Sequence, residues 1–213
     1  MCCGSLGCGV KKTLHALERD SEANQRRRAE YLAELADVRP DQLVFSDESG
    51  VTTSLTRLYG RCVGGARIGE ATPGGRWQVL TLLGALSLRG VQAMMTIPAP
   101  TDGEIFRTFL DQVLAPTLRP GDVLVVDNLS AHKVAGVRQI VEKRGARVLY
   151  LPPYSPDLNP IEPAWSKLKT LLRAAKARTE EALQHAITDL LPQITPADAA
   201  GWFRRSGIGL QHV

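Results

Sequence analysis

Three carboxylates lie where two buried strands are expected to end and a helix is expected to begin. Asp47 and Asp127 each follow an apolar run typical of a buried strand, and Glu162 comes directly before Pro163. Proline is tolerated in the first turn of a helix, because the N–H that it lacks would have no partner there. Carboxylates are the ligands that Mg²⁺ prefers in proteins. The three residues therefore predict a divalent metal site.

Such a site suits phosphodiester chemistry. Two cations about 4 Å apart can activate a nucleophile and stabilise the leaving oxygen. A carboxylate at the end of a buried strand is held rigidly, and its charge is costly beside an apolar core unless it is paired or bound to a metal. Alone, either aspartate could instead cap a turn or a helix, and Glu162 could complement a helix dipole. The combination of all three favours the metal site.

A row of basic residues follows Glu162 along the expected helix. Lys169, Arg173 and Lys176 fall on the same helix face as Glu162, at steps of three and four residues from Ser166 onward. Such a row suits a DNA phosphate backbone that leads toward the metal site, although a solvated basic face is the alternative. The residues predicted to bind DNA are Lys167, Lys169, Arg173, Lys176 and Arg178.

Two further polar residues lie close to the aspartates in the sequence. Glu48 is expected to point to the opposite side of the strand from Asp47, so it is not assigned as a metal ligand. It could order that strand or a nearby base. His132 could contact the substrate, but it more readily helps to start the helix that follows it.

The elements that must position these residues alternate between strands and helices. A hairpin is expected across Arg89-Gly90, and Thr101 with Glu104 predicts a capping box. The strand before Asp127 is apolar throughout, as a strand buried on both faces must be. The expected fold class is α/β, a mixed sheet flanked by helices on both faces. Strands are expected at 43–46, 54–63, 77–88, 91–97, 123–126 and 147–151, and helices at 101–114, 133–144, 162–177 and 179–191.

The first forty residues differ from the rest of the chain. Residues 1–10 have no periodicity, and their Cys2, Cys3 and Cys8 suggest either a metal knuckle or, since a fourth ligand is missing, incidental reduced thiols. Residues 11–39 predict a polar helix with a thin apolar stripe, typical of a linker to something upstream. We therefore expect a tail and linker helix over residues 1–40 and a catalytic domain with C-terminal helices over residues 41–213.

Length and composition are those of one globular domain. The chain has 213 residues, of which 44% are hydrophobic and 23% are charged. Its formal charge of +4 favours an anionic partner, although so small an excess is weak evidence by itself. No run approaches the roughly 18 apolar residues of a membrane span, and the N-terminus does not have the order of a signal peptide. We expect a cytoplasmic protein with no membrane partner.

The motifs resemble those of mariner-type insertion-sequence transposases, which belong to the DDE superfamily. Thirty-four residues separate Asp127 from Glu162, which is the spacing of this branch. The resemblance covers about residues 40 to 200. It rests on Ser46-Asp47-Glu48-Ser49-Gly50, on Val126-Asp127-Asn128 followed by Ala131-His132, and on Pro152-Pro153-Tyr154-Ser155-Pro156 with Leu158-Asn159-Pro160-Ile161-Glu162 and Trp165.

The resemblance implies a ribonuclease-H-like fold in which Asp47, Asp127 and Glu162 bind two Mg²⁺ ions, with Mn²⁺ as a substitute. Water would first attack double-stranded DNA at the end of the element, and the freed 3′-hydroxyl would then join target DNA. A second copy of the chain or a full-length transposase is the expected protein partner. The resemblance also makes Glu48, Asn128, His132, Asn159 and Trp165 supporting residues of the site.

One departure from the resemblance concerns DNA recognition. Such transposases carry an N-terminal helix-turn-helix region that recognises the terminal repeats, and residues 1–46 cannot hold it. The segment Lys11-Lys12-Thr13-Leu14-His15 resembles the tail end of that region. We therefore expect a truncated product or the downstream half of a frameshifted gene. Two other functions stay open: a silent relic that binds DNA or full-length transposase, and a ribonuclease-H-like nuclease or resolvase for hybrids or branched DNA.

Overall fold

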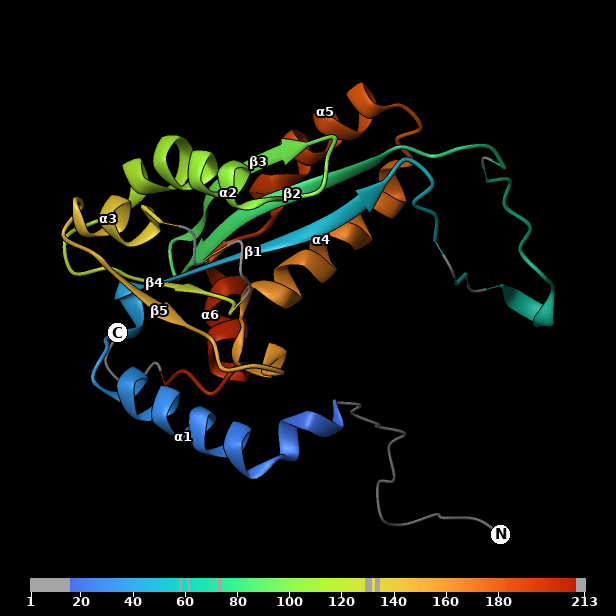
Figure 1. Ribbon diagram of the computed structural model, residues 1–213. Helices are drawn as coiled ribbons and strands as arrows, with labels where there is room; N and C mark the ends of the chain where they lie inside the picture. The colour runs from blue at the N-terminus through green and yellow to red at the C-terminus, as the bar shows by residue number, and fades with distance from the viewer. Residues whose placement is uncertain are drawn as a thin grey trace, which may run out of the picture.

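The fold is built on one mixed sheet. The computed structural model describes residues 16–57, 59–60, 62–72, 74–128, 132 and 135–209. In this part of the chain, five strands form a sheet in the order β3-β2-β1-β4-β5, with helices on both faces (Figure 1). The predicted α/β fold with a mixed sheet is therefore confirmed. The strands are β1 (Leu43–Thr52), β2 (Val79–Ser87), β3 (Gly90–Ile97), β4 (Val123–Val126) and β5 (Arg147–Tyr150).

Strand β1 joins an antiparallel half of the sheet to a parallel half. It pairs antiparallel with β2, which forms the predicted hairpin with β3. On its other side β1 pairs parallel with β4, and β4 pairs parallel with β5. All four residues of β4 are buried, as its unbroken apolar sequence predicted.

The helices pack on the two faces of this sheet. Helices α2 and α3 cover one face, and α4 and α6 cover the other. The α-helices are α1 (Glu22–Ala36), α2 (Gly103–Phe109), α3 (Val137–Glu142), α4 (Ile161–Ala175), α5 (Glu180–Leu190) and α6 (Pro196–Arg205). A π-helical turn (Leu110–Leu114) extends α2, and short 3-10 turns cover Leu17–Asp20, Pro40–Gln42, Val63–Gly65, Ala115–Thr117, Pro156–Leu158 and Leu191–Gln193.

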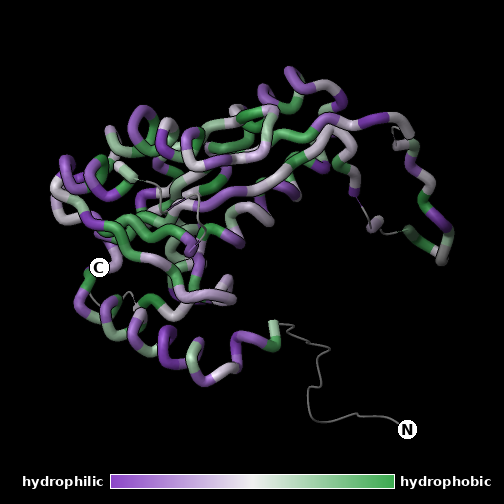
Figure 2. The backbone as a smooth tube through the Cα atoms, in the orientation of Figure 1, coloured by the Kyte–Doolittle hydropathy of each residue, from purple (hydrophilic) through white to green (hydrophobic). Residues whose placement is uncertain are grey.

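The alternation of side chains along β1 divides the core into two clusters. Phe45 packs with the residues of α4 and α6, and its ring meets the edge of Phe203 at 5.4 Å between centroids. Val44 packs on the other face with α2 and α3. Figure 2 shows the contrast between the hydrophobic strands and the mostly hydrophilic α1. Tyr31 is the buried hydrophobic residue that α1 adds to the core.

Two strand predictions were wrong. β1 does not end at Ser46 but continues to Thr52, because β2 supplies a partner along its whole length. The segment expected to be a strand at 54–63 contains no strand among its described residues. It belongs to an arm between β1 and β2 that extends away from the sheet (Figure 1), where a strand would have no neighbour to pair with.

Several helix predictions need correction at their ends. Asp102, not Thr101, caps α2, because the Asp102 carboxylate accepts hydrogen bonds from the backbone N–H groups of Glu104 and Ile105. Helix α1 begins at Glu22 after a separate 3-10 turn, and α3 begins at Val137. Helix α6 was missed, although Thr195 and Asp198 form a capping box at its start. The helix predicted at 179–191 is present as α5, and Thr179 caps it by accepting a hydrogen bond from the backbone N–H of Ala182.

The N-terminal predictions fall largely outside the described residues. Cys2, Cys3, Cys8 and the segment Lys11 to His15 belong to that part of the chain. Cys62 is a free, exposed cysteine. Along the described part of the chain, every helix is too short or too polar to cross a membrane.

Candidate active site

Asp47 and Asp127 are neighbours at the end of the parallel ladder between β1 and β4. The last paired residues of this ladder are Ser46 and Val126. Each aspartate is the next residue on its strand, so the two lie side by side where the parallel pairing stops. Asp127 follows the end of its strand as predicted, whereas Asp47 lies inside β1 opposite Gly84 of β2.

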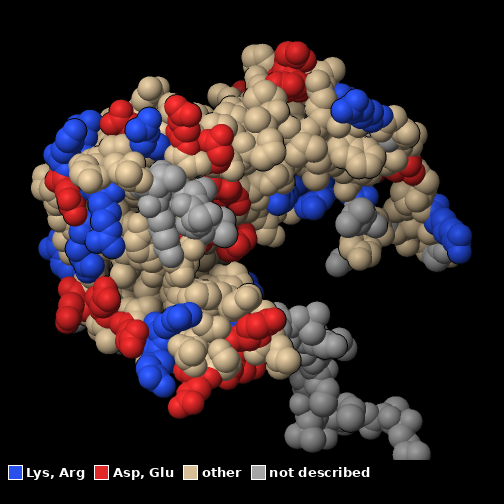
Figure 3. Space-filling model, in the orientation of Figure 1, with Lys and Arg blue, Asp and Glu red and all other residues tan. Residues whose placement is uncertain are grey.

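Glu162 enters the same cavity from the first turn of α4. A cavity of about 360 Å³ is lined by all three carboxylates, by Asn128 and Asn159, and by residues 151–156. Figure 3 shows a hollowed face on which Asp and Glu side chains gather near the centre and Lys and Arg side chains lie beside them. The structure therefore brings the three predicted metal ligands to one cavity.

The surroundings of Asp47 make its negative charge costly. Burial raises the pKa of Asp47 to about 7, against the hydrogen bond from the Glu48 backbone N–H, and repulsion from Glu162 and Asp127 adds to the rise. Asn159 Nδ2 donates a hydrogen bond of 3.1 Å to Asp47 Oδ2. The cavity thus holds three acidic groups, two of which, Glu162 and Asp127, repel the charge of Asp47.

His132 connects Asp127 to Glu48. Its Nε2 lies 3.2 Å from Glu48 Oε1, and its Nδ1 contacts Asp127 Oδ1. Burial alone would lower the pKa of His132, but the contacts with Asp127 and Glu48 raise it to about 9. The ring is fully buried against Phe106, so His132 supports the two carboxylates and does not face the cavity. Glu48 points away from Asp47, as predicted.

The sequence of this region matches a known family. Residues 42–184 match the family described as DDE superfamily endonuclease. The chain belongs to this family. The three carboxylates that line the cavity all lie within the matched residues.

Solved structures of Mos1 transposase share the fold of this DDE domain. The structure of a Mos1 transposase paired-end complex with the left transposon end has 17% sequence identity to this chain and a TM-score of 0.73. The match covers 97% of this chain and 64% of the Mos1 chain. A Mos1 mariner paired-end complex with Mn has 16% identity and a TM-score of 0.73, and the match covers 96% of this chain and 64% of the Mos1 chain. The separate Mos1 catalytic domain has 16% identity and a TM-score of 0.67, and the match covers 92% of this chain and 94% of the Mos1 domain. No curated protein sequence matches the chain.

These likenesses confirm the ribonuclease-H-like fold. The chain spans about two thirds of the Mos1 chains in the paired-end complexes, and nearly all of the separate Mos1 catalytic domain. The likeness at this level of identity concerns the fold, so the chemistry must be argued from the residues of this chain.

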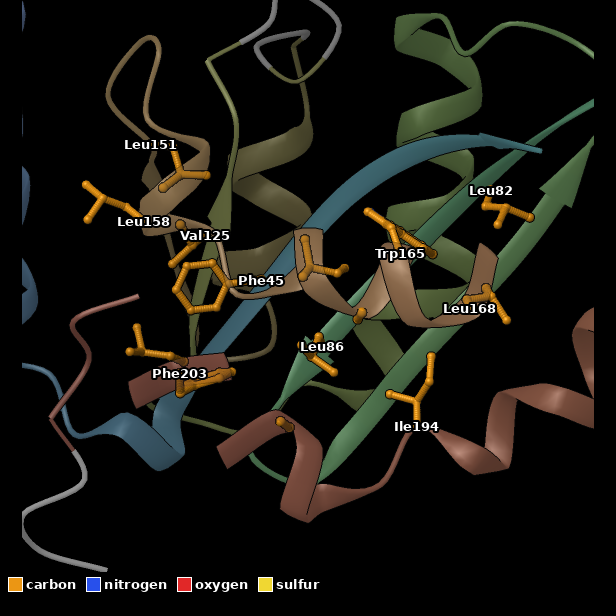
Figure 4. Packing of buried hydrophobic residues seen from close by; sticks show 14 of the residues in the cluster. Phe45, Leu82, Leu86, Val125, Leu151, Leu158, Trp165, Leu168, Ile194 and Phe203 are labelled. Atoms are coloured by element: carbon orange, nitrogen blue, oxygen red, sulfur yellow. The ribbon is translucent and has the colours of Figure 1, made fainter. Parts of the chain in front are cut away.

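Trp165 holds α4 against the sheet behind the carboxylates of the DDE domain. The side chain is buried and lies over β2 with Leu168 beside it (Figure 4). A Cβ atom at Gly84 would come within 2.5 Å of Trp165 Cη2, so only glycine leaves room for this ring. Gly84 pairs with Asp47 across the sheet, so the Trp165 ring packs directly beside the strand position of Asp47.

The predicted DNA-binding residues divide into two groups. Lys167 pairs with Asp198 at 2.6 Å and Lys176 pairs with Glu70 at 2.6 Å. Arg178 donates hydrogen bonds to the backbone oxygens of residues 53 and 55 in the arm. The other two, Lys169 and Arg173, make no hydrogen bond or ion pair with any described part of the chain.

A polar contact beside the cavity was not predicted from the sequence. Arg28 of α1 donates hydrogen bonds to Ser155 Oγ at 2.7 Å and to both carboxylate oxygens of Asp157, at 3.1 and 2.8 Å. The signal was present in α1, where the buried residues Asn24, Arg28 and Tyr31 recur at steps of four and three. This spacing marks one docked face, which the search for an apolar stripe overlooked.

Proposed function

We propose that the chain is the catalytic unit of a transposase, which cleaves DNA at the ends of an insertion sequence and joins the freed end to target DNA. The observation that supports this most strongly is the single cavity lined by Asp47, Asp127 and Glu162 in a member of the DDE superfamily. Two of these carboxylates are fixed by neighbouring strands and the third by a helix packed on the sheet.

The residues of the cavity fit divalent cations. Its charged donors are all carboxylate oxygens, which suit Mg²⁺ and Mn²⁺. Asn159 Oδ1 is buried with no hydrogen-bond partner among the described residues, so it is available to a metal-bound water. Mos1 paired-end complexes have been solved with Mn and with Mg. We propose two Mg²⁺ ions, replaceable by Mn²⁺, held by Asp47, Asp127 and Glu162.

The carboxylates must move closer together to bind these ions. Within the described part of the chain, no three side chains of the types His, Cys, Asp and Glu already lie close enough to enclose a metal. Glu162 is exposed, so its side chain has room to turn toward the aspartates. Removal of the repulsion on Asp47 would favour this movement when a cation enters.

The chemistry would consist of two phosphoryl transfers. Bound cations would activate water and stabilise the leaving oxygen. In the first transfer, a water oxygen bonds to phosphorus and the bond to the 3′ oxygen breaks, which leaves a 3′-hydroxyl and a 5′-phosphate. In the second, that 3′-hydroxyl bonds to a target phosphorus and displaces a target 3′ oxygen. Asp47, Asp127 and Glu162 would hold the cations, and Asn159 orients Asp47 through its hydrogen bond.

The DNA backbone would approach along α4. Lys169 and Arg173 lie on the same helix face as Glu162, and each is half-buried rather than extended into solvent. We propose that these two side chains contact phosphates next to the cleaved bond. Lys167, Lys176 and Arg178 would do so only after they release their partners within the chain. A second copy of the chain, or a full-length transposase, is the proposed protein partner.

Nicking of supercoiled plasmid by the purified chain tests this function. With Mg²⁺ or Mn²⁺ present, the parent should nick the plasmid, and Asp127→Asn and Glu162→Gln should each lower the rate at least about a hundredfold. Glu181→Gln is the matched control, because Glu181 occupies the first turn of α5 away from the cavity. Equal nicking by the parent and Asp127→Asn would exclude the proposed chemistry. A folded parent that binds DNA without metal-dependent nicking would instead indicate a silent relic.

A further inference from the structure

Helix α1 combines a narrow hydrophobic contact with polar contacts to the domain. Its buried residues are Asn24, Arg28 and Tyr31, and the remaining side chains are half-buried or exposed. A helix that packs only by hydrophobic burial would show a wider apolar stripe. The position of α1 therefore depends on directional hydrogen bonds, of which those of Arg28 are the most buried.

Arg28 makes three hydrogen bonds to one short segment. Its guanidinium binds both oxygens of Asp157 in the bidentate manner that gives arginine its geometric specificity, and it also donates to Ser155 Oγ. Arg28 and Ser155 are 8% and 5% exposed, so water competes little for the hydrogen bond between them. Arg19 adds a hydrogen bond of 3.2 Å to Asp157. Asp157 is therefore neutralised by arginine and does not line the carboxylate cavity.

The segment that Arg28 holds is the wall of the active-site cavity. Residues 151–156 line that cavity, and Ser155 Oγ in turn donates to the Pro153 carbonyl at 3.1 Å. Within this wall Tyr154 has a left-handed backbone with φ of 56°. Such a conformation is unfavourable for a non-glycine residue and persists only where the surrounding structure holds it. Arg28 restrains the following residue, Ser155, by donating a hydrogen bond to its Oγ.

The same segment leads directly to the residues that face Asp47. Asn159, two residues after Asp157, donates to Asp47 Oδ2, and its own carbonyl accepts the backbone N–H of Glu162 at 3.3 Å. A displacement of the wall therefore reaches both Asn159 and the start of α4. The path from α1 to the cavity runs from Arg28 to Asp157 and along the chain to Asn159, where it branches to Asp47 and to Glu162.

We infer that Arg28 is a positioning residue of the active site, which fixes the wall segment so that Asn159 and Glu162 face Asp47. This inference rests on the proposed function. Because α1 precedes residue 42, where the DDE family match begins, part of what sets the catalytic geometry lies outside the matched domain. Whatever moves α1 would then change the rate of cleavage without touching the carboxylates.

The test compares Arg28→Met, Arg28→Lys and Asp157→Asn in the full chain. Arg26→Met is the matched control, because the Arg26 side chain is 69% exposed and pairs only within α1, with Glu22. We expect Arg28→Met to lower kcat for plasmid nicking about ten- to a hundredfold while the KM for DNA changes less than about twofold. Arg28→Lys keeps the charge but not the bidentate geometry, so its kcat should be intermediate. Arg26→Met should match the parent.

Amide hydrogen exchange gives a second readout that does not need activity. In Arg28→Met and Asp157→Asn, exchange over residues 151–160 should become faster than in the parent, while exchange in β1 and β4 stays slow. Asp157→Asn nearly preserves the shape of the side chain, so it keeps the test decisive if Arg28→Met does not fold. Unchanged exchange over 151–160, or faster exchange with an unchanged kcat, would overturn the inference.

The two proposals fail in different ways. If the parent and Asp127→Asn nick equally, the proposed function fails, and the exchange data alone then decide whether α1 holds the wall. If the parent nicks and Asp127→Asn does not, the proposed function stands. A lower kcat with a nearly unchanged KM in Arg28→Met then supports the positioning role. A kcat equal to that of Arg26→Met contradicts it.

Discussion

Helices α1 and α4 bear on the same cavity but are held by different forces. α4 buries Ile161, Ala164, Trp165, Leu168 and Leu172 along one stripe, which packs on the sheet. α1 is of the same length, 15 residues, and buries a stripe of polar character centred on Arg28. The hydrophobic attachment of α4 is large and tolerates small shifts, whereas the attachment of α1 depends on the geometry of a few hydrogen bonds.

The contrast suggests a division of tasks between the two helices. α4 carries Glu162, and its position is set by the core and so by the overall stability of the fold. α1 adjusts the wall beside Glu162 and can be altered without unfolding the sheet. Segments held by few apolar contacts open more readily than core elements do.

The largest effect is expected when a buried side chain of α4 is truncated. Leu168 is fully buried, so Leu168→Ala should lower the free energy of unfolding by about 2–5 kcal/mol through lost burial and a cavity. Leu32→Ala makes the same chemical change on α1, where the side chain is 43% exposed, and should cost less than about 1 kcal/mol. Urea unfolding measures both. Equal losses would remove the contrast between the helices.

A substitution at Gly84 tests how closely α4 must approach the sheet. Gly84→Ala would place a methyl group against the Trp165 ring and should lower the free energy of unfolding by about 1–3 kcal/mol. Gly50→Ala is the control, because a Cβ at Gly50 meets no atom within 4 Å. Thermal unfolding of the two variants gives the comparison, and a Gly84→Ala protein as stable as Gly50→Ala would contradict the account.

The attachment of α1 should depend on pH. Burial alone would raise the pKa of Asp157, but the hydrogen bonds and charge of Arg28, with the charge of Arg19, lower it below its ordinary value. A lowered folded-state pKa means that the carboxylate stabilises the fold above about pH 4, and that this contribution is lost as the pH falls through the folded-state pKa. Because the side chain is 41% exposed, solvent screening reduces the effect to roughly 1 kcal/mol.

Urea unfolding at several pH values checks this dependence. Asp157→Asn should be less stable than the parent at pH 7, and the difference should shrink between pH 5 and pH 3. Asp189→Asn, at an exposed position of α5, should show little difference at either end of the range. A deficit for Asp157→Asn that is the same at pH 7 and pH 3 would show that the carboxylate charge does not hold α1.

The smallest expected effect concerns the basic side chains on the Glu162 face of α4. If Lys169 and Arg173 each contact a phosphate, Lys169→Met and Arg173→Met should each reduce the slope of log affinity against log salt by about 0.9. Lys176→Met is the comparison and should change the slope less, because Lys176 must first release Glu70 to reach a phosphate. DNA-binding titrations between 50 and 200 mM salt measure the slopes. A larger change for Lys176→Met than for Lys169→Met would reverse the assignment.

The two helices also show what the sequence could predict. The α4 residues Trp165 and Leu168 follow a helical apolar period, and β4 is apolar throughout, so both elements and the carboxylates at their ends could be predicted. The end of β1 could not be predicted, because the length of this strand depends on its pairing with β2, which lies some thirty residues later in the chain. The contact between Arg28 and Asp157 joins residues 129 positions apart, and no local pattern specifies such a partner.

Anomalous scattering from crystals soaked in Mn²⁺ tests whether Asp47, Asp127 and Glu162 share bound cations. We expect anomalous density within the cavity bounded by these three side chains in the parent, and none there in Asp127→Asn soaked in the same way. Density in the parent at another acidic site, such as Asp157 or Asp198, with none in the cavity, would show that the three carboxylates do not bind the cations.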